Sequence, residues 1–216
     1  MVSLMSGDSS EVSRLAHQAA TGDQAAWADL LARHEGRLRR MIVLRLDRRL
    51  QGRLDAADVL QEVYLEAFAH LADYVRNPTM PFFLWLRAIA GHKLLELHRQ
   101  HLGTQMRDAN REVSLYRGAL PTASSAALAA QLLGKHTSPT EAAVRAERLL
   151  RLQEALNTLD PIDREILSLR HFEQLSRAET AQVLGIEEGA AAKRHIRALK
   201  RLKGILAGMP GGLEGI

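Results

Sequence analysis

The sequence predicts an all-α protein made of two small helical domains joined by a linker. Aromatic residues make up only 4% of the 216 residues while hydrophobic residues reach 46%, and a composition rich in Leu, Ala, Arg and Glu favours helices over sheets. Residues typical of helix caps precede apolar runs with helical spacing. No stretch of useful length alternates apolar and polar residues as a strand would.

The first predicted domain, residues 10–102, holds helices with clear limits. Aspartates stand where N-caps are expected, because their side chains accept hydrogen bonds from the free N–H groups of the first turn. Prolines stand where a helix ends or begins. We therefore predict helices that start near residues 23, 55 and 81, the last running to about residue 101. The residues that mark these limits are Asp23, Asp55, Asp58, Asn77, Pro78 and Pro81.

Residues 103–137 are predicted to form the linker, because Gly, Pro and Ser interrupt any helical pattern there except near residues 128–133. The second domain, residues 138–208, shows three more capped helix starts, at Ser138, Asp160 and Ser176. Gly185 then allows a left-handed turn, after which a further helix starts at about residue 188.

The helix after Asp55 has two different sides. One side is apolar and is predicted to be core. The other joins acidic and amide side chains to an outward leucine, which suits docking of a basic partner helix; an ordinary solvated face is the alternative. The predicted core positions are Leu60, Val63, Tyr64, Ala67, Phe68 and Leu71, and the outward residues are Asp58, Gln61, Glu62 and Leu65.

The helix after Pro81 also combines a core stripe with a second side. That side carries a tryptophan beside cations, a composition that stacks on unpaired bases while holding phosphates. Packing of the tryptophan on a neighbouring helix explains it equally well. The core stripe is Phe83, Leu86, Ala90, Leu94 and Leu97, and the second side has Trp85, Ile89, His92, Glu96 and Arg99, with Lys93 at its margin. Eight arginines within residues 33–53 form either a phosphate-facing surface or a solvated one.

Residues 193–203 contain six lysines and arginines and no acidic residue. At about 100° per residue, most of these cations fall within an arc of roughly 120° on the predicted helix. A cationic helix delivered by a tight turn suits the major groove of DNA; a surface helix with solvated charges is the alternative. The cations in the arc are Lys193, Arg194, Arg197, Lys200 and Arg201, and the opposite, apolar positions are Ala191, Ala198, Leu199, Leu202 and Leu206.

The composition also excludes several classes of protein. The chain has no cysteine, which rules out disulfides and cysteine-ligated zinc. No apolar run approaches the ~20 residues of a membrane span, and the first ten residues lack the apolar core of a signal peptide. We expect a cytoplasmic protein without membrane association, bound metal or other cofactor. The net charge of +4 is compatible with a nucleic-acid partner.

Taken together, these motifs resemble the sigma-70 family of bacterial RNA polymerase sigma factors. Residues 55–68 resemble the clamp-binding helix, and residues 82–99 resemble the helix that opens and reads the −10 promoter element. Residues 159–167 and 175–189 resemble region 4, a winged-helix-like helix-turn-helix domain that reads the −35 element. Two such domains with no third between them are similar to the extracytoplasmic-function (ECF) subgroup.

The resemblance implies a region 2-like domain at 10–102, a region 4-like domain at 138–208, and a specificity subunit that is not an enzyme. The implied partners are core RNA polymerase, promoter DNA (duplex at −35 and single-stranded at −10) and an anti-sigma factor. The implied polymerase-binding residues are Asp58, Gln61, Glu62 and Leu65; those for the −10 element are Asn77, Phe82, Trp85, His92, Lys93, Glu96 and Arg99; those for the −35 element are Glu188, Lys193, Arg194, Arg197, Lys200 and Arg201.

The chain departs from the family pattern at three places. Glu187 stands where a serine usually caps the recognition helix, residues 190–192 are alanines where Thr-Val-Lys is usual, and Gly91-His92 replaces the usual Arg-Asn pair. These differences affect which promoter sequence is read.

Two other functions are considered. An autonomous dimeric helix-turn-helix regulator would bind a palindrome without polymerase. A metal-dependent hydrolase is suggested by His92, Glu96, His98 and His101, but one helix cannot turn all four toward a single ion, and no HExxH motif is present. We expect His98 to be a packing residue instead.

Overall fold

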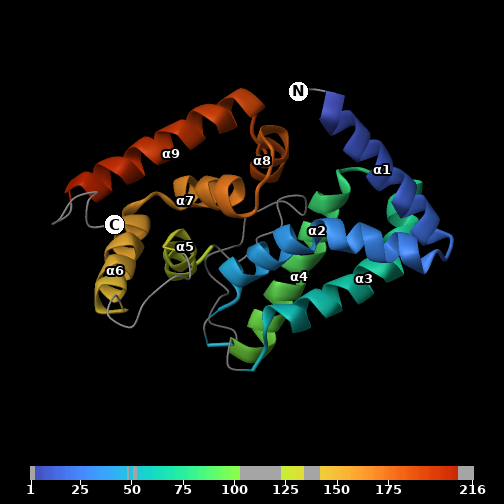
Figure 1. Cartoon of the computed structure of the whole chain (residues 1–216), viewed down its shortest axis with the longest axis horizontal. Helices are drawn as coiled ribbons and strands as arrows, with labels where there is room; N and C mark the ends of the chain where they lie inside the picture. The colour runs from blue at the N-terminus through green and yellow to red at the C-terminus, as the bar shows by residue number, and fades with distance from the viewer. Residues whose placement is uncertain (1–2, 48, 51–52, 103–122, 134–141, 209–216) are drawn as a thin grey trace. The chain divides into compact units, whose positions relative to one another are not determined.

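The computed structural model describes residues 3–47, 49–50, 53–102, 123–133 and 142–208, and is shown in Figure 1. These ranges contain helices and no strand, which confirms the predicted all-α class. The described part of the second unit therefore has no β-hairpin of the kind that forms the wing of a winged-helix domain. The chain separates into two compact units, residues 1–121 and 122–216. The functional domain limits of 10–102 and 138–208 remain predictions.

Within the described residues, the first unit contains the helices α1 (Ser3–Ala20), α2 (Gln24–Arg45), α3 (Ala56–Arg76) and α4 (Phe82–Leu102). Helix α1, which sequence analysis did not predict, packs on α2 and α3, and both of these pack on α4. None of the helices described in either unit combines the length and apolar character needed to cross a membrane.

The predicted caps set the helix limits of this unit. Asp23 accepts a hydrogen bond from the Ala26 N–H at 3.0 Å. Asp55 and Asp58 exchange hydrogen bonds with each other's backbone N–H groups at 2.9 Å, which forms a capping box at the start of α3. Asn77 ends α3, as expected before a proline.

The core of the first unit follows the predicted stripes except at Tyr64, which is only partly buried, and at Phe68 and Ile89. All five predicted core residues of α4 are buried, and so are Leu60, Val63, Ala67 and Leu71 of α3. Phe68 was predicted to be core but is 50% exposed, because it lies at the edge of the packed side, where its ring contacts the ring of Trp27. Ile89, predicted to face outward, is 9% exposed.

The second unit begins with a helix inside the predicted linker. Helix α5 (Ser125–Leu132) is capped by Ser124 and packs on α6 (Ala142–Thr158). Leu128 is 1% exposed, so this part of the linker belongs to the core of the second unit. The predicted cap at Ser138 lies outside the described residues.

A helix-turn-helix completes this unit. Helix α7 (Pro161–Leu167) begins at its predicted cap, Asp160, and continues into a π-helical turn, η3 (Ser168–Phe172). Helix α8 (Arg177–Leu184) starts with a capping box between Ser176 and Glu179. Gly185 ends α8 with a φ of +61°, a conformation that glycine adopts without steric cost. The last helix, α9 (Glu188–Gly208), packs on α6, α7 and α8.

We predict that Leu128→Ala destabilises the second unit by about 2–5 kcal/mol, because it leaves a cavity between α5 and α6. Leu132→Ala is the matched control on the same helix, since Leu132 is 48% exposed and its loss should cost at most about 0.5 kcal/mol. Urea unfolding followed by circular dichroism measures both changes. Equal stability of the two variants would mean that α5 is not part of the packed unit.

Candidate functional site

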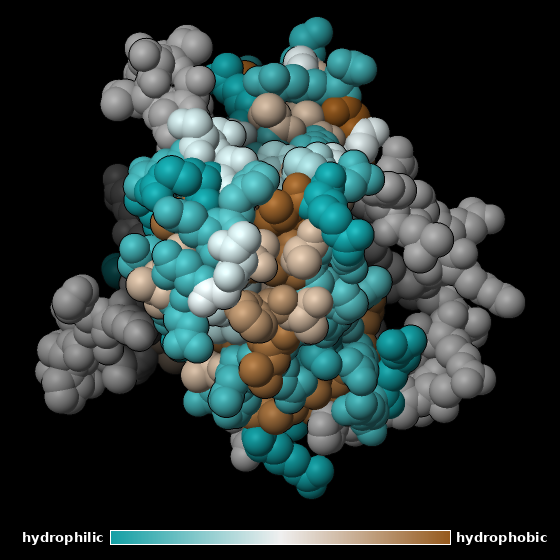
Figure 2. Space-filling model, turned by 90° about the vertical axis from the view of Figure 1, so that its right-hand side faces the viewer, coloured by the Kyte–Doolittle hydropathy of each residue, from teal (hydrophilic) through white to brown (hydrophobic). Residues whose placement is uncertain are grey.

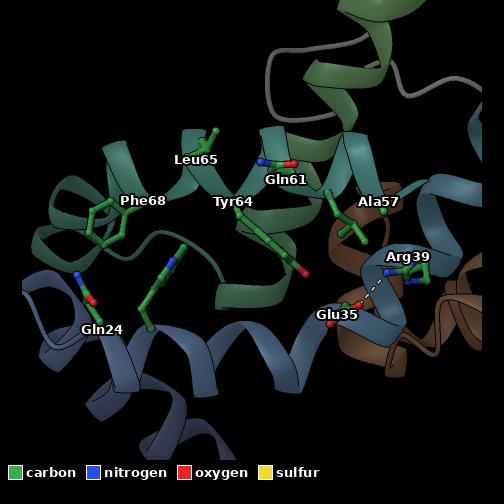
Figure 3. A pocket seen from close by; sticks show the side chains of 10 residues that line it. Gln24, Glu35, Arg39, Ala57, Gln61, Tyr64, Leu65 and Phe68 are labelled. Carbon is green, nitrogen blue, oxygen red and sulfur yellow. Dashed lines mark hydrogen bonds and ion pairs between the residues drawn. The ribbon is translucent and has the colours of Figure 1, made fainter. Parts of the chain in front are cut away.

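Helices α2 and α3 enclose a groove of about 550 Å³ on the surface of the first unit. Figure 3 shows Tyr64 pointing from α3 toward α2, and Leu65 pointing away from α2. The groove combines aromatic and aliphatic side chains with two glutamines and one ion pair. The residues that line it are Gln24, Trp27, Glu35, Arg39, Ala57, Leu60, Gln61, Tyr64, Leu65 and Phe68.

Two large apolar side chains of α3 are exposed at this groove. Leu65 is 67% exposed and Phe68 is 50% exposed. The ring of Phe68 lies 5.5 Å from the ring of Trp27 on α2, which gives the groove an aromatic wall. Figure 2 shows apolar surface interrupting the hydrophilic covering on one side of the molecule. Exposed apolar surface rimmed by polar side chains is typical of protein interaction sites.

The polar residues predicted to dock a partner lie on the same exposed side of α3. Asp58, Gln61 and Glu62 are all exposed, and Gln61 and Leu65 also line the groove. The predicted docking surface and the groove are therefore continuous. Acidic groups beside exposed apolar ones suit a partner that presents basic and apolar side chains together. One carboxylate oxygen of Asp58 is already used in the helix cap.

The inner wall of the groove is uncharged at neutral pH except for one ion pair. Burial raises the pKa of Tyr64 to about 12, and the negative charge of Glu35 contributes to this shift. Glu35 pairs with Arg39 one turn later on α2, at 2.9 Å. Sequence analysis predicted Tyr64 as core and missed the part of α2 in this site, because no motif on α2 marks Trp27 as facing α3.

An aromatic cluster joins the end of α3 to the start of α4. The rings of Tyr74 and Trp85 are stacked, with centroids 4.6 Å apart and planes 25° apart. The Tyr74 hydroxyl donates a hydrogen bond to the Met80 carbonyl at 2.9 Å, which holds the connecting turn. Trp85 is partly exposed, as a base-stacking residue must be. The packing interpretation of Trp85 is therefore confirmed, while its partial exposure leaves base stacking as a prediction.

Phe82 does not lie where a DNA contact would require it. Its side chain is only 4% exposed, because the rings of His34, Tyr74 and Trp85 surround it at 5.4–5.5 Å. The prediction that Phe82 faces DNA is corrected by this burial. Phe82 instead packs against the ring of Trp85.

Lys93 is also placed differently from the prediction. Its ammonium lies 2.9 Å from Glu96, 3.4 Å from Glu62 and 3.8 Å from Glu66, and the side chain is only 18% exposed. The hydrogen bond that the Lys93 ammonium donates to the Glu96 carboxylate is the main reason that the pKa of Lys93 is raised. Three carboxylates neutralise this cation, so in this conformation Lys93 ties α3 to α4 and is not available to a phosphate. The Glu96 carboxylate is engaged in the same ion pair with Lys93.

The remaining residues predicted for the −10 element, Asn77, His92 and Arg99, are exposed on the first unit.

His98 is 4% exposed, and its Nε2 accepts a hydrogen bond from the Asp47 N–H at 3.3 Å. Burial lowers the pKa of His98, which keeps it neutral at pH 7. This confirms its expected packing role. Within the described residues, no three or more His, Asp or Glu side chains gather as a metal cluster.

Helix α9 presents most of its predicted cations to solvent. Glu188, Lys193, Arg197 and Lys200 are exposed, and Arg194 is partly exposed. Ala191, Ala198 and Leu206 are buried as predicted. Leu199 was predicted to be packed but is 39% exposed, because α7 and α8 cover a narrower strip of α9 than the apolar pattern suggests.

Arg201 faces a different neighbour from the other cations. Its guanidinium donates a hydrogen bond to the carboxylate of Asp163 on α7, and this carboxylate side chain is only 5% exposed. A buried carboxylate requires such a partner. Arg201 therefore helps to position α9 on α7. Its side chain is still 58% exposed, and the prediction that it contacts DNA stays a prediction. The sequence could not reveal this pair, because the two residues are 38 positions apart.

Comparison with known proteins agrees with this geometry. A family model described as sigma-70, region 4, matches residues 149–202. The ECF RNA polymerase sigma factor SigD of Mycobacterium tuberculosis is 35% identical over 150 residues, which cover 69% of this chain and 62% of SigD. The match therefore spans less than two thirds of the length of SigD.

Other relatives are matched over nearly their whole length. The ECF RNA polymerase sigma factor ShbA of Streptomyces griseus is 31% identical over 199 residues, 90% of this chain and 94% of ShbA. A structure of the sigma factor CnrH in complex with the cytosolic domain of CnrY superposes with a TM-score of 0.54 at 26% identity, covering 91% of this chain and 97% of that one. The chain belongs to the ECF RNA polymerase sigma factors.

Proposed function

We propose that this protein binds core RNA polymerase and directs it to specific promoters, without catalysing a reaction itself. The observation that carries the proposal is that one unit holds an exposed apolar and acidic surface on α3, while the other holds an exposed cationic helix in a helix-turn-helix. Family membership supports the same function. An autonomous dimeric regulator would need the cationic helix but has no evident use for the α3 surface.

Core polymerase binds at the exposed side of α3 together with the groove. Leu65 and Phe68 supply apolar contact area, and Gln61 can exchange hydrogen bonds at its rim. Asp58 and Glu62 provide negative charge for a basic partner helix. Compared with the surface predicted from sequence, this site adds Phe68 and the Trp27 wall of α2.

The −10 element is held on α4. Unstacking a base costs a few kcal/mol, and stacking it on an aromatic side chain returns about 1–3 kcal/mol. Trp85 serves as this platform because Tyr74 fixes its plane from the other side. Asn77, His92 and Arg99 are the exposed polar residues that can hold the captured strand.

The −35 element is bound by the exposed side of α9. The first turns of a recognition helix meet the base edges, so Glu188, Lys193, Arg194 and Arg197 are the proposed base and phosphate contacts. Lys200 lies farther along the helix and is a phosphate contact.

A second polypeptide also belongs to the proposed function. The relative CnrH has been solved with the cytosolic domain of CnrY bound. We propose that an anti-sigma factor regulates this protein in a similar way, and that it acts inside the cytoplasm together with its polymerase.

Replacing Phe68 by Ala should weaken binding to core polymerase about tenfold or more, because central aromatic anchors carry much of an interface's free energy. Phe68 is half exposed, so the variant should stay folded. Fluorescence anisotropy of labelled protein titrated with core polymerase measures the dissociation constant. Leu150→Ala removes an exposed leucine on α6 and serves as the control. Wild-type affinity in Phe68→Ala would remove the groove from the docking site.

Replacing Trp85 by Ala should preserve polymerase binding but impair promoter opening. The stacking platform is lost, while the exposed docking residues of α3 near Leu65 are unchanged. Tyr74→Phe keeps the stacked ring and removes only the hydrogen bond to Met80, so opening should stay near normal. Permanganate footprinting of unpaired thymines detects opening. Normal opening by Trp85→Ala would refute the role of Trp85.

Lys200 and Arg201 are neighbours on α9 for which the structure predicts opposite effects. Lys200→Ala should leave stability unchanged and reduce the slope of log affinity for duplex DNA against log salt by about 0.9, since one phosphate contact is lost. Arg201→Ala should cost about 1–3 kcal/mol of stability, because it leaves a buried carboxylate unpaired, and should leave the slope unchanged. Thermal unfolding and salt-dependent anisotropy distinguish the two residues; the reverse pattern would contradict this assignment of Arg201.

A further inference from the structure

Two histidines of the second unit, His171 and His195, lie side by side, and neither was assigned to a docking or DNA-binding surface above. His171 lies in the π-helical turn η3, and His195 lies in α9. Their Nε2 atoms are 2.8 Å apart, their ring centroids are 5.0 Å apart, and the rings are tilted by 38°. Sequence analysis gave no reason to pair them, since they are 24 positions apart and belong to no motif.

The separation of the two nitrogens matches that of two ligands on one metal ion. Metal–imidazole bonds are about 2.0–2.1 Å long, so two imidazole nitrogens at a right angle around an ion lie about 2.9 Å apart. A tetrahedral angle would need about 3.3–3.4 Å by the same bond lengths. The observed 2.8 Å between the nitrogens thus fits cis positions of a square-planar or octahedral ion better than a tetrahedral ion. Both rings must turn for this, because their Nε2 atoms now point at each other and not at a common ion.

Both rings are in the chemical form that binds metals. Burial is the main cause that lowers the pKa of each histidine; the charge of Arg170 also lowers both, and His195 is further lowered by His171 and Arg177. The imidazoles are therefore neutral at pH 7, so a metal ion does not have to displace a proton. The same two arginines repel a cation, which limits the affinity.

We propose that His171 and His195 together bind one divalent transition-metal ion, with Cu²⁺ bound most tightly, then Ni²⁺. Imidazole nitrogens suit these ions, both accept cis nitrogen ligands at right angles, and Cu²⁺ leads the usual affinity order. No third His, Asp or Glu joins the pair among the described residues, so water completes the coordination.

The proton balance of binding is simple. Without metal, one ring donates its Nε2–H to the Nε2 of the other. With metal, both Nε2 lone pairs point at the ion, and the donor ring carries its proton on Nδ1 instead. The pair exchanges one hydrogen bond for two metal bonds and loses no proton to solution.

Binding would fasten α9 to η3. His195 directly follows Arg194 and precedes Arg197 by two positions, both of which are proposed DNA contacts. A metal ion bridging His195 and His171 would fix the first turns of α9 against the rest of the unit. The inference does not depend on the proposed function, because it concerns metal affinity alone.

Calorimetric titration of the untagged full chain with CuCl₂ and with NiCl₂ tests the proposal. We expect one site in the wild-type protein that is weakened at least tenfold in both His171→Gln and His195→Gln. His70→Gln removes an exposed histidine of α3 and should leave the site intact. Cu²⁺ electron paramagnetic resonance should show two equatorial nitrogens in the wild type and one in either variant.

Three results would overturn the proposal: no binding by the wild type up to millimolar metal, an isotherm for His195→Gln equal to that of the wild type, or loss of binding in His70→Gln alone. Far-ultraviolet circular dichroism of each variant establishes that the helices are retained. Weakened binding with a retained helical spectrum is the result that supports the site.

Discussion

The burial of one side of α3 against its neighbouring helices is the constraint on which the first unit depends. Val63, Ala67 and Leu71 are almost fully buried, and the helical period then forces Gln61 and Leu65 to the opposite side. The exposed surface is therefore a consequence of the core. Packing of α3 also places its last turn beside α4, where Tyr74 orients Trp85. The proposed docking surface and the proposed base-stacking platform thus lie on the same packed helices.

The second unit uses a different device to place its functional helix. A capping box starts α8, a left-handed glycine ends it, and a charged pair between Asp163 and Arg201 seats α9 on α7. One cation of α9, Arg201, makes this contact, while Lys193, Arg197 and Lys200 are exposed. The basic residues of α9 therefore include one that attaches the helix to the unit and others that we propose attract DNA phosphates.

Local features of the sequence predicted most helix limits but not all of the site. Caps such as Asp55 and Ser176 act within one turn, so their effect can be recognised from neighbouring residues alone. The exposure of Phe68 depends on how far α2 extends across α3, which no local pattern contains. Lys93 and Arg201 were predicted to contact DNA, because local sequence does not show that carboxylates of other helices lie beside them. These carboxylates are Glu62 on α3 for Lys93 and Asp163 on α7 for Arg201. Helical periodicity tells which side of a helix is apolar, and only tertiary packing tells how much of that side is covered.

We propose that two separate surfaces on two helical units let this chain recruit a polymerase to chosen DNA sites. The decisive experiment is transcription reconstituted from core RNA polymerase, the purified protein and genomic DNA, with the 5′ ends of the transcripts mapped. New start sites that share upstream sequence elements should appear only when the protein is added. Unchanged start sites, despite normal folding of the protein, would contradict it.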